Sequence, residues 1–359
     1  MQDRAYETEL TAGEETRPAA EGGHEQTGVA TSDNARAASG ATGVKGRAEN
    51  VQADDAAAPD GAGGATAEGV AAVDGTPAKP VPNAPGSATA ATSTSDDITT
   101  RLRPIFTQEG LDALASSRVL VFGLGGVGSS CVEALARATV GELFLVDRDT
   151  VDKSNLNRQA LAFECTVGRV KAEVMTEMVA QINPRCHVEA RQCYVSADNL
   201  PEILAWAGAE VDEAGNVVGR GQISYVVDAI DTITQKLALA KLCWDANIPE
   251  ISSMGAANRL DPTQFQIADV RKSHGCRMAR TIRKECLRRR IPHLQVLFSP
   301  EKPVRPSAVA GSSHGGLPNL GTASYMPPIM GQMVAGRVIR ALIGYEPWPW
   351  DRAGEDNGD

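Results

Sequence analysis

The amino-acid sequence predicts an α/β fold, in which a mostly parallel sheet carries helices on both faces. Three observations predict it. Short apolar runs alternate with amphipathic segments of helical length from Arg101 onward. A glycine-rich turn at 123–128 joins an apolar run to such a segment, and acidic residues close two of the later apolar runs. This pattern indicates a Rossmann-like domain, extended by additional strands and a C-terminal helix.

The first half of this domain alternates regularly between strands and helices. Apolar runs predict buried strands at 118–123, 142–147, 223–228 and 249–253, and alternation predicts a strand at 187–193. Helices are expected at 126–137, 167–182 and 234–246. Because helices connect the strands, the strands are expected to run parallel. The acidic, glycine-containing stretch 209–222 predicts a surface hairpin without a catalytic role.

The second half of the domain is less regular. Alternation predicts strands at 263–269 and 293–298. Two helices are expected, a very basic one at 278–289 and an apolar one at 329–343. The apolar segment 325–342 is short for a membrane span and carries Arg337 and Arg340, so we interpret it as a buried helix.

Composition separates a folded domain from its flanks. The chain has 359 residues, and the segment 11–100 contains no leucine, phenylalanine or tryptophan. Such a segment cannot bury enough apolar surface to offset its ordering entropy. We therefore expect a disordered, low-complexity acidic tail at 1–99, one folded domain at 100–345 and a disordered C-terminal tail at 346–359.

Charge and cysteine content limit the functional classes. The formal net charge of −10 argues against a generic nucleic-acid binder. Seven scattered cysteines, an odd number, favour a reducing compartment over a disulfide framework. The first residues include no apolar segment typical of a secretion signal. These features predict a cytoplasmic protein.

The glycine-rich turn supplies the first candidate binding residues. Its glycines permit a tight turn, close approach of a phosphate to backbone N–H groups, and close packing of helix against strand. They are Gly123, Gly125, Gly126 and Gly128. A purely structural turn is the alternative. Asp147 ends the next strand, where it would hydrogen-bond a ribose hydroxyl or cap a turn. These residues explain NAD and ATP equally well.

Two cations distinguish ATP from NAD. Arg158 and Lys171 follow the second strand, and aimed cations stabilise a triphosphate that is cleaved between its α and β phosphorus atoms. Lys171 lies near the start of a helix, where a lone lysine gains nothing from the helix dipole; a solvated lysine is the alternative. Asp231 follows the strand that ends at Asp228. It is placed to hold a hydrated Mg²⁺ or, alternatively, to cap the next helix.

Four short motifs follow one another along the chain: VDRDTVD at 146–152, SNLNRQ at 154–159, GRVK at 168–171 and INP at 182–184. With them, the chain from Arg101 to about Leu342 resembles the E1-like, adenylate-forming superfamily that activates ubiquitin-like proteins. The resemblance implies that Asp147 and Asp149 face the adenosine and metal region, and that Asp231 assists the metal. It implies that four side chains line the triphosphate: Asn155, Arg158, Gln159 and Lys171. Arg101 resembles an arginine that enters the partner's nucleotide site in the family's dimers, which implies a homodimer.

Later segments narrow the resemblance. The stretches 255–263, 267–275, 296–301 and 323–328 are similar to those of the tRNA threonylcarbamoyladenosine dehydratases. These enzymes use ATP to activate the carboxylate of the modified base at position 37 of tRNA, which then closes into a ring. The resemblance implies ATP, Mg²⁺ and a tRNA substrate, and it leaves room for a sulfur-mobilising or sulfur-acceptor protein partner.

Two features of the residues favour this branch. Paired C-x-x-C motifs, which bind zinc in other activators, are missing, and Cys276 and Cys286 are too far apart to form one. The basic helix and its end carry cations that would contact tRNA phosphates, a solvated charged helix being the alternative. These cations are Arg277, Arg280, Arg283, Lys284, Arg288, Arg289 and Arg290.

Three other functions stay open. The same adenylation on a protein C-terminus would activate a ubiquitin-like or sulfur-carrier protein. An NAD-linked oxidoreductase would leave Arg158, Lys171 and Asp231 without a role. A structural RNA-binding module would bind RNA without ATP turnover.

Overall fold

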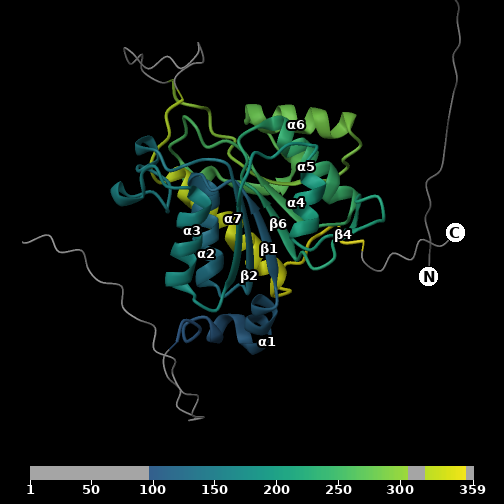
Figure 1. The fold of residues 1–359 in the computed structure, drawn as a ribbon. Coiled ribbons are helices and arrows are strands. Elements are labelled where there is room, and N and C mark those ends of the chain that lie inside the picture. Colours follow the sequence, from purple (N-terminus) through teal and green to yellow (C-terminus); the bar gives the residue numbers. More distant parts are fainter. Residues whose placement is uncertain (1–96, 306–319, 353–359) are drawn as a thin grey trace, which may run out of the picture. The chain divides into compact units, whose positions relative to one another are not determined.

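The computed structural model describes residues 97–305 and 320–352, so most of the expected N-terminal tail lies outside the described residues. Within this part of the chain a seven-stranded sheet has the order β3-β2-β1-β6-β7-β9-β8 (Figure 1). Its strands are β1 (Arg118–Phe122), β2 (Glu142–Asp147), β3 (His187–Gln192), β6 (Tyr225–Asp228), β7 (Glu250–Ser253), β8 (Gln266–Asp269) and β9 (Gln295–Phe298). Neighbouring strands are parallel except for the antiparallel β8–β9 pair, which confirms the mostly parallel α/β fold.

Helices cover both faces of this sheet. They are α1 (Arg103–Ala115), α2 (Gly126–Arg137), α3 (Lys171–Ile182), α4 (Leu200–Trp206), α5 (Ile233–Asp245), α6 (Arg277–Arg288) and α7 (Met326–Leu342). Side chains of α2, α3 and α7 share one hydrophobic core with one face of the sheet, and those of α4, α5 and α6 pack on the opposite face. Figure 1 shows α2 and α3 on one side of the strands and α4 to α6 on the other.

The central strands are apolar because both of their faces are covered. In β1, Val119 and Val121 belong to the core under α2, whereas Leu120 and Phe122 face α4 and α5. All four are fully buried. The alternation of side chains in a strand therefore leaves no solvent face for polar residues, and the strand reads as a continuous apolar run.

Several boundaries differ from the expected ones for local reasons. The helix expected at 167–182 begins at Lys171, because Val170 is extended. The strand expected at 263–269 begins only at Gln266, after a short 3₁₀ turn at Pro262–Gln264. Helix α7 begins three residues earlier than expected, because proline fits the first turn of a helix. The hairpin expected within 209–222 is present as β4 (Glu210–Val211) and β5 (Val217–Gly219).

The segment after α7 packs on the domain, contrary to the disordered tail expected from residue 346. Trp348 is 9% exposed and joins the core. The Trp350 ring stacks on His293 with centroids 4.8 Å apart, and the Arg352 guanidinium lies 4.6 Å from the centroid of the Trp244 ring. The folded domain therefore continues to Arg352, and the remainder of the expected tail lies outside the described residues.

Helix α7 is buried, as expected for the apolar segment near the C-terminus. Among the residues that the structure describes, no helix is both long enough and apolar enough to cross a membrane.

Candidate nucleotide-binding and catalytic site

The glycine turn connects β1 to α2 at the carboxyl end of the sheet. Gly123 has φ +87, and a Cβ there would lie 2.7 Å from the Ala229 carbonyl oxygen. A Cβ at Gly128 would lie 1.7 Å from the Gly123 carbonyl oxygen. A Cβ at Gly125 would meet nothing within 4 Å. The geometry of the turn therefore requires glycine at positions 123 and 128. Gly125 has no such requirement, and its missing side chain leaves open space beside the N–H groups that begin α2.

Asp147 ties the end of β2 to this turn. Its carboxylate is buried and accepts two backbone hydrogen bonds, from Leu124 at 2.5 Å and from Asp149 at 2.8 Å. It therefore fixes the turn rather than capping a helix. A carboxylate has about four acceptor positions, so Asp147 keeps acceptor capacity for a ligand hydroxyl.

Lys171 is the first residue of α3, and its side chain is only 5% exposed. The Lys171 Nζ atom lies 3.0 Å from Asp149 Oδ2, and the Lys171 N–H donates to the Asp149 carbonyl oxygen at 3.1 Å. Asp149 itself is half exposed. A cation at a helix N-terminus is opposed by the helix dipole, so this lysine depends on a nearby anion. A freely solvated lysine is thereby excluded.

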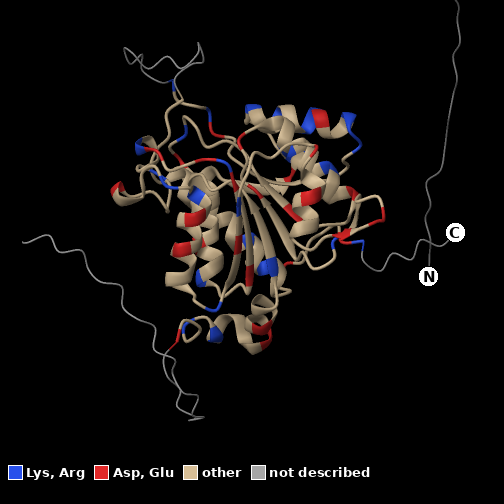
Figure 2. Cartoon of the chain, in the orientation of Figure 1, with Lys and Arg blue, Asp and Glu red and all other residues tan. Residues whose placement is uncertain are grey.

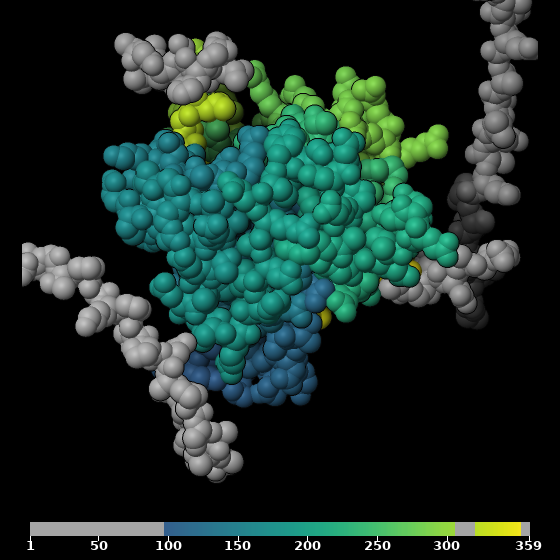
Figure 3. All heavy atoms as spheres, in the orientation of Figure 1, coloured from purple at the N-terminus to yellow at the C-terminus, as the bar shows by residue number. Residues whose placement is uncertain are grey.

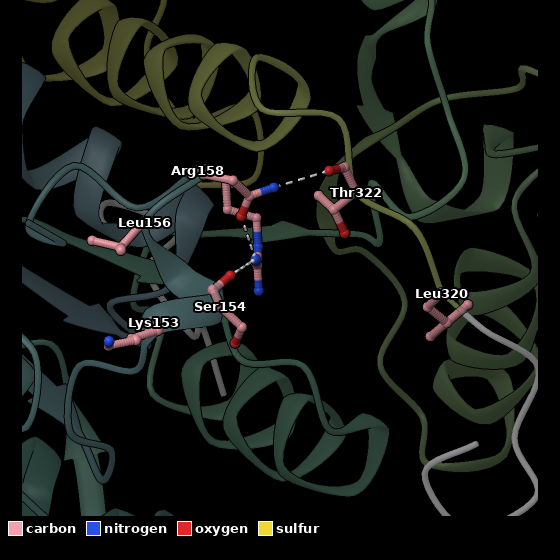
Figure 4. Close-up of a pocket in the computed structure, with 7 residues that line it drawn as sticks. Lys153, Ser154, Leu156, Arg158, Leu320 and Thr322 are labelled. Atoms are coloured by element: carbon pink, nitrogen blue, oxygen red, sulfur yellow. Dashed lines mark hydrogen bonds between the residues drawn. The ribbon is translucent and has the colours of Figure 1, made fainter. Parts of the chain in front are cut away.

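The 3₁₀ turn at Lys153–Asn155 and the residues after it form the next wall. Asn155 and Gln159 are buried, and Gln159 Oε1 has no hydrogen-bond partner among the described residues. The Arg158 Nη1 atom donates to the Ser154 carbonyl and to Asn157 Oδ1, both at 2.8 Å. Asn157 Nδ2 donates to the Thr322 carbonyl oxygen at 3.2 Å, and Figure 4 shows Leu320 across the opening from Ser154. A buried acceptor without a partner indicates that a ligand or water completes this wall.

These elements enclose a cavity of about 580 Å³, within the usual size range of small-molecule pockets. It brings together ten of the residues predicted from the sequence. They are Gly123, Gly125, Gly126, Asp147, Asp149, Asn155, Arg158, Gln159, Lys171 and Asp231. Two residues predicted for the nucleotide site lie outside it: Gly128 packs beneath the turn, and Arg101 is exposed next to α1.

Sequence reasoning missed several cavity residues. Tyr194 follows β3, and its hydroxyl accepts a 2.5 Å hydrogen bond from Gln235 Nε2 in α5. Gln235 is buried, and its Oε1 atom has no partner among the described residues. Met254 and Met278 line the cavity further on. No local motif marks these residues; only their position after a strand or at a helix start was a signal.

Asp231 lies exposed on the turn between β6 and α5. The N-cap of α5 is Thr232, and no side chain caps it, so the capping alternative is not supported. Asp147, Asp149 and Asp231 are the carboxylates lining the cavity, and no cluster of three or more metal-ligating side chains occurs in the described ranges. Mg²⁺ on a nucleotide needs only one or two carboxylates besides phosphates and water, so these residues fit such an ion.

Some of the basic side chains of helix α6 and its end have partners within the domain, and others are exposed without an ion pair among the described residues. Arg288 and Arg289 pair with Glu285, and Arg283 donates to Ser273 Oγ at 2.9 Å. Four side chains are exposed and form no ion pair within residues 97–305 and 320–352. We call them the exposed cations of α6, a name that includes Arg290 just beyond the helix: Arg277, Arg280, Lys284 and Arg290. Basic positions recur along α6 in Figure 2, and its side chains stand out from the surface in Figure 3.

The parallel sheet, the glycine turn and the polar cavity at the strand ends define an α/β nucleotide-binding protein of the Rossmann type. The chain belongs to the ThiF family, whose model matches residues 99–353. The resemblance carried by the sequence motifs is therefore confirmed.

The chain is similar to two curated relatives and to one solved structure. The tRNA threonylcarbamoyladenosine dehydratase of Bacillus subtilis is 42% identical over 198 residues, 55% of this chain and 72% of the relative. That of Haemophilus influenzae is 33% identical over 251 residues, 67% of this chain and 90% of the relative. The crystal structure of the Escherichia coli tRNA N6-threonylcarbamoyladenosine dehydratase TcdA in complex with ATP matches with a TM-score of 0.57 and 29% identity. The match covers 70% of this chain and 98% of that one.

Proposed function

We propose that this chain is an ATP-dependent tRNA threonylcarbamoyladenosine dehydratase, which cyclises N6-threonylcarbamoyladenosine at position 37 of tRNA. One observation carries the proposal: a buried lysine, an arginine and a glycine turn converge on one cavity, in a chain whose relatives bear this name. An NAD-linked enzyme would not need Lys171 buried beside Asp149 at this cavity.

Different residues of the cavity bind different parts of ATP. The N–H groups at the start of α2 face the phosphates, and Asp147 accepts from a ribose hydroxyl. Arg158 and Lys171 stabilise the charge that grows on the phosphates as the substrate reacts. Asp231 and Asp149, which both line the cavity, would hold Mg²⁺, and the bound ion would neutralise phosphate charge.

The reaction then takes two steps. An oxygen of the substrate carboxylate attacks the α-phosphorus, and the bond from that phosphorus to pyrophosphate breaks. A nitrogen of the same modified side chain next attacks the activated acyl carbon, loses its proton and displaces AMP, which closes the ring. Both steps use groups of the substrate itself, and no cysteine nucleophile is required.

We propose two further features of the enzyme. It is a homodimer in which Arg101 of each protomer reaches the partner's cavity, which agrees with the exposure of Arg101 outside its own cavity. The exposed cations of α6 contact tRNA phosphates, and a tRNA substrate implies activity in the cytoplasm. We assign these functions to the folded domain, of which the structure describes residues 97–305 and 320–352.

Mass spectrometry of nucleosides from tRNA tests the proposal in cells. Deleting the gene should replace cyclic threonylcarbamoyladenosine by the open form, and the wild-type gene, but not a Lys171→Ala variant, should restore the ring. Unchanged cyclic nucleoside in the deletion strain would refute the proposed function.

An exchange assay with purified protein separates the proposal from its alternative. Labelled pyrophosphate should enter ATP only when tRNA carrying the open nucleoside is present. Exchange that depends instead on a protein ending in Gly-Gly would identify an activator of a ubiquitin-like or sulfur-carrier protein.

A further inference from the structure

A buried polar cluster lies where β6 and β7 meet the first turn of α5. Asp228 and Ser252 are opposite each other in the two strands, and both are fully buried. Lys236 of α5 is 1% exposed. The Lys236 Nζ atom contacts Asp228 Oδ2 at 3.0 Å, the Asp228 carbonyl at 3.3 Å and Ser252 Oγ at 3.2 Å. The three protons of the ammonium group thus meet three acceptors.

Stability alone does not account for this lysine. Taking an ammonium group and a carboxylate out of water costs several kcal/mol per ion, and an apolar pair of similar volume often stabilises a core as well or better. The ion pair instead fixes how the three elements are arranged, because the ammonium group of Lys236 can make all three contacts only in one arrangement of β6, β7 and α5.

Each of the three joined elements continues directly into a wall of the cavity. Asp228 Oδ1 accepts from the Ile230 N–H at 3.0 Å, which shapes the turn that carries Asp231. Ser252 precedes the cavity-lining stretch 253–257 of β7 and its loop, and Lys236 follows the cavity residue Gln235. The ammonium group lies behind the cavity surface, because Lys236 does not line it.

We propose that Lys236 is a positioning residue, whose ammonium group joins β6, β7 and α5 and thereby fixes Asp231 for binding a metal–nucleotide complex. The inference rests on the proposed function, since it takes Asp231 as the ligand of Mg²⁺ bound with ATP. It predicts an effect on metal-dependent nucleotide binding without any contact between Lys236 and the nucleotide.

The test uses a charge-balanced variant. Lys236→Met alone leaves Asp228 buried and unpaired and is expected to destabilise the fold, whereas Asp228→Asn with Lys236→Met removes both charges. Titration calorimetry of the full chain then gives affinities for ATP with Mg²⁺ and for AMP without metal. The double variant should need about tenfold more Mg²⁺ for half-maximal ATP binding, while its AMP affinity stays within about twofold of wild type.

Two further variants make the outcome decisive. Ser252→Ala keeps the ion pair, removes one contact of the ammonium group and should raise the Mg²⁺ requirement about threefold. Lys241→Met removes a lysine from the same helix that pairs with Asp245 and lies outside the cavity lining, and it should leave the Mg²⁺ requirement unchanged.

The possible results are distinguishable. A wild-type Mg²⁺ requirement in both the double variant and Ser252→Ala would overturn the positioning role. Equal losses of AMP and Mg²⁺–ATP affinity would also overturn it, because a general distortion of the cavity would then be sufficient. Failure of the wild-type chain to bind ATP at all would instead remove the proposed function.

Discussion

Replacing Lys171 by Met separates a catalytic cation from a structural ion pair. Met keeps most of the aliphatic stem of the buried Lys171, the first residue of α3, and removes the charge. The partner, Asp149, is half exposed, so water can solvate it once the lysine is gone. The variant therefore leaves no unpaired charge in the interior, and we expect the free energy of unfolding to change by no more than about 1 kcal/mol.

The expected loss of activity is much larger. A donor that faces charge developing in a transition state typically contributes about 2.7–4 kcal/mol, which corresponds to about 10²–10³ in kcat. The assay is tRNA-dependent pyrophosphate exchange, followed by single-turnover ring closure on the same preparation. Lys241→Met is the matched control, because Lys241 is an exposed lysine of α5 that pairs with Asp245 far along the helix.

A double-mutant cycle with Asp149→Asn completes the test. If Lys171 served only the ion pair, Lys171→Met and Asp149→Asn would have equal effects, and the combined variant would be no worse than either. A kcat within threefold of wild type in a well-folded Lys171→Met variant would refute the catalytic assignment.

Three more predictions concern other parts of the chain. Burial and the nearby Asp228 carboxylate raise the pKa of Glu250 well above its usual range, so the native state binds a proton that the unfolded state releases above about pH 4.5. Relative to wild type, Glu250→Gln should therefore gain stability as the pH rises above that value, by at most about 1.4 kcal/mol per pH unit and only until Glu250 ionises in the native state. Urea unfolding measures this difference, and a pH-independent difference would contradict the shift. Changing the exposed cations of α6 to Gln should make the plot of log affinity for tRNA against log salt shallower by about three, and an unaltered slope would exclude α6 from the tRNA surface. Mixing inactive Arg101→Ala and Lys171→Met proteins should restore about a quarter of wild-type activity at full subunit exchange, whereas mixtures that stay inactive would contradict a site completed in trans.

The sequence predicted the sheet well because its central strands are covered on both faces. It missed helix α1, whose apolar periodicity is weak: three of its residues are buried, and Thr107 interrupts it with φ 61. It also missed α4, which has only seven residues. Elements that bury little surface leave little trace in the hydrophobic pattern.

The C-terminal segment shows a different kind of failure. Composition suggested a tail after residue 345, yet Trp348 and Trp350 pack against the domain. The signal was present, since two tryptophans within three residues bring more apolar area than a solvated tail normally carries. Averaging over the surrounding polar residues obscured it.

Some residues of the candidate site could be predicted from local motifs in the sequence, and others could not. The glycine turn and Lys171 belong to local motifs, so their grouping in one cavity could be expected from the sequence. Gln235 and Tyr194 meet across 41 residues, and Asp228 and Ser252 meet across 24. Those contacts depend on how the loop after β3 meets α5 and how β6 pairs with β7, which no local pattern specifies.

The two buried lysines beside the cavity illustrate opposite uses of the same side chain. Lys171 pairs with one half-exposed carboxylate, so phosphate oxygens can replace that partner at modest cost. Lys236 has three acceptors, and its partners Asp228 and Ser252 are wholly buried, so no ligand can compete for it. The exposure of the partner, rather than that of the lysine, therefore separates a cation available to substrate from one that holds the frame. On this argument Lys171→Met should reduce kcat at any Mg²⁺ concentration, whereas the loss caused by removing Lys236 should be recovered in part by excess Mg²⁺.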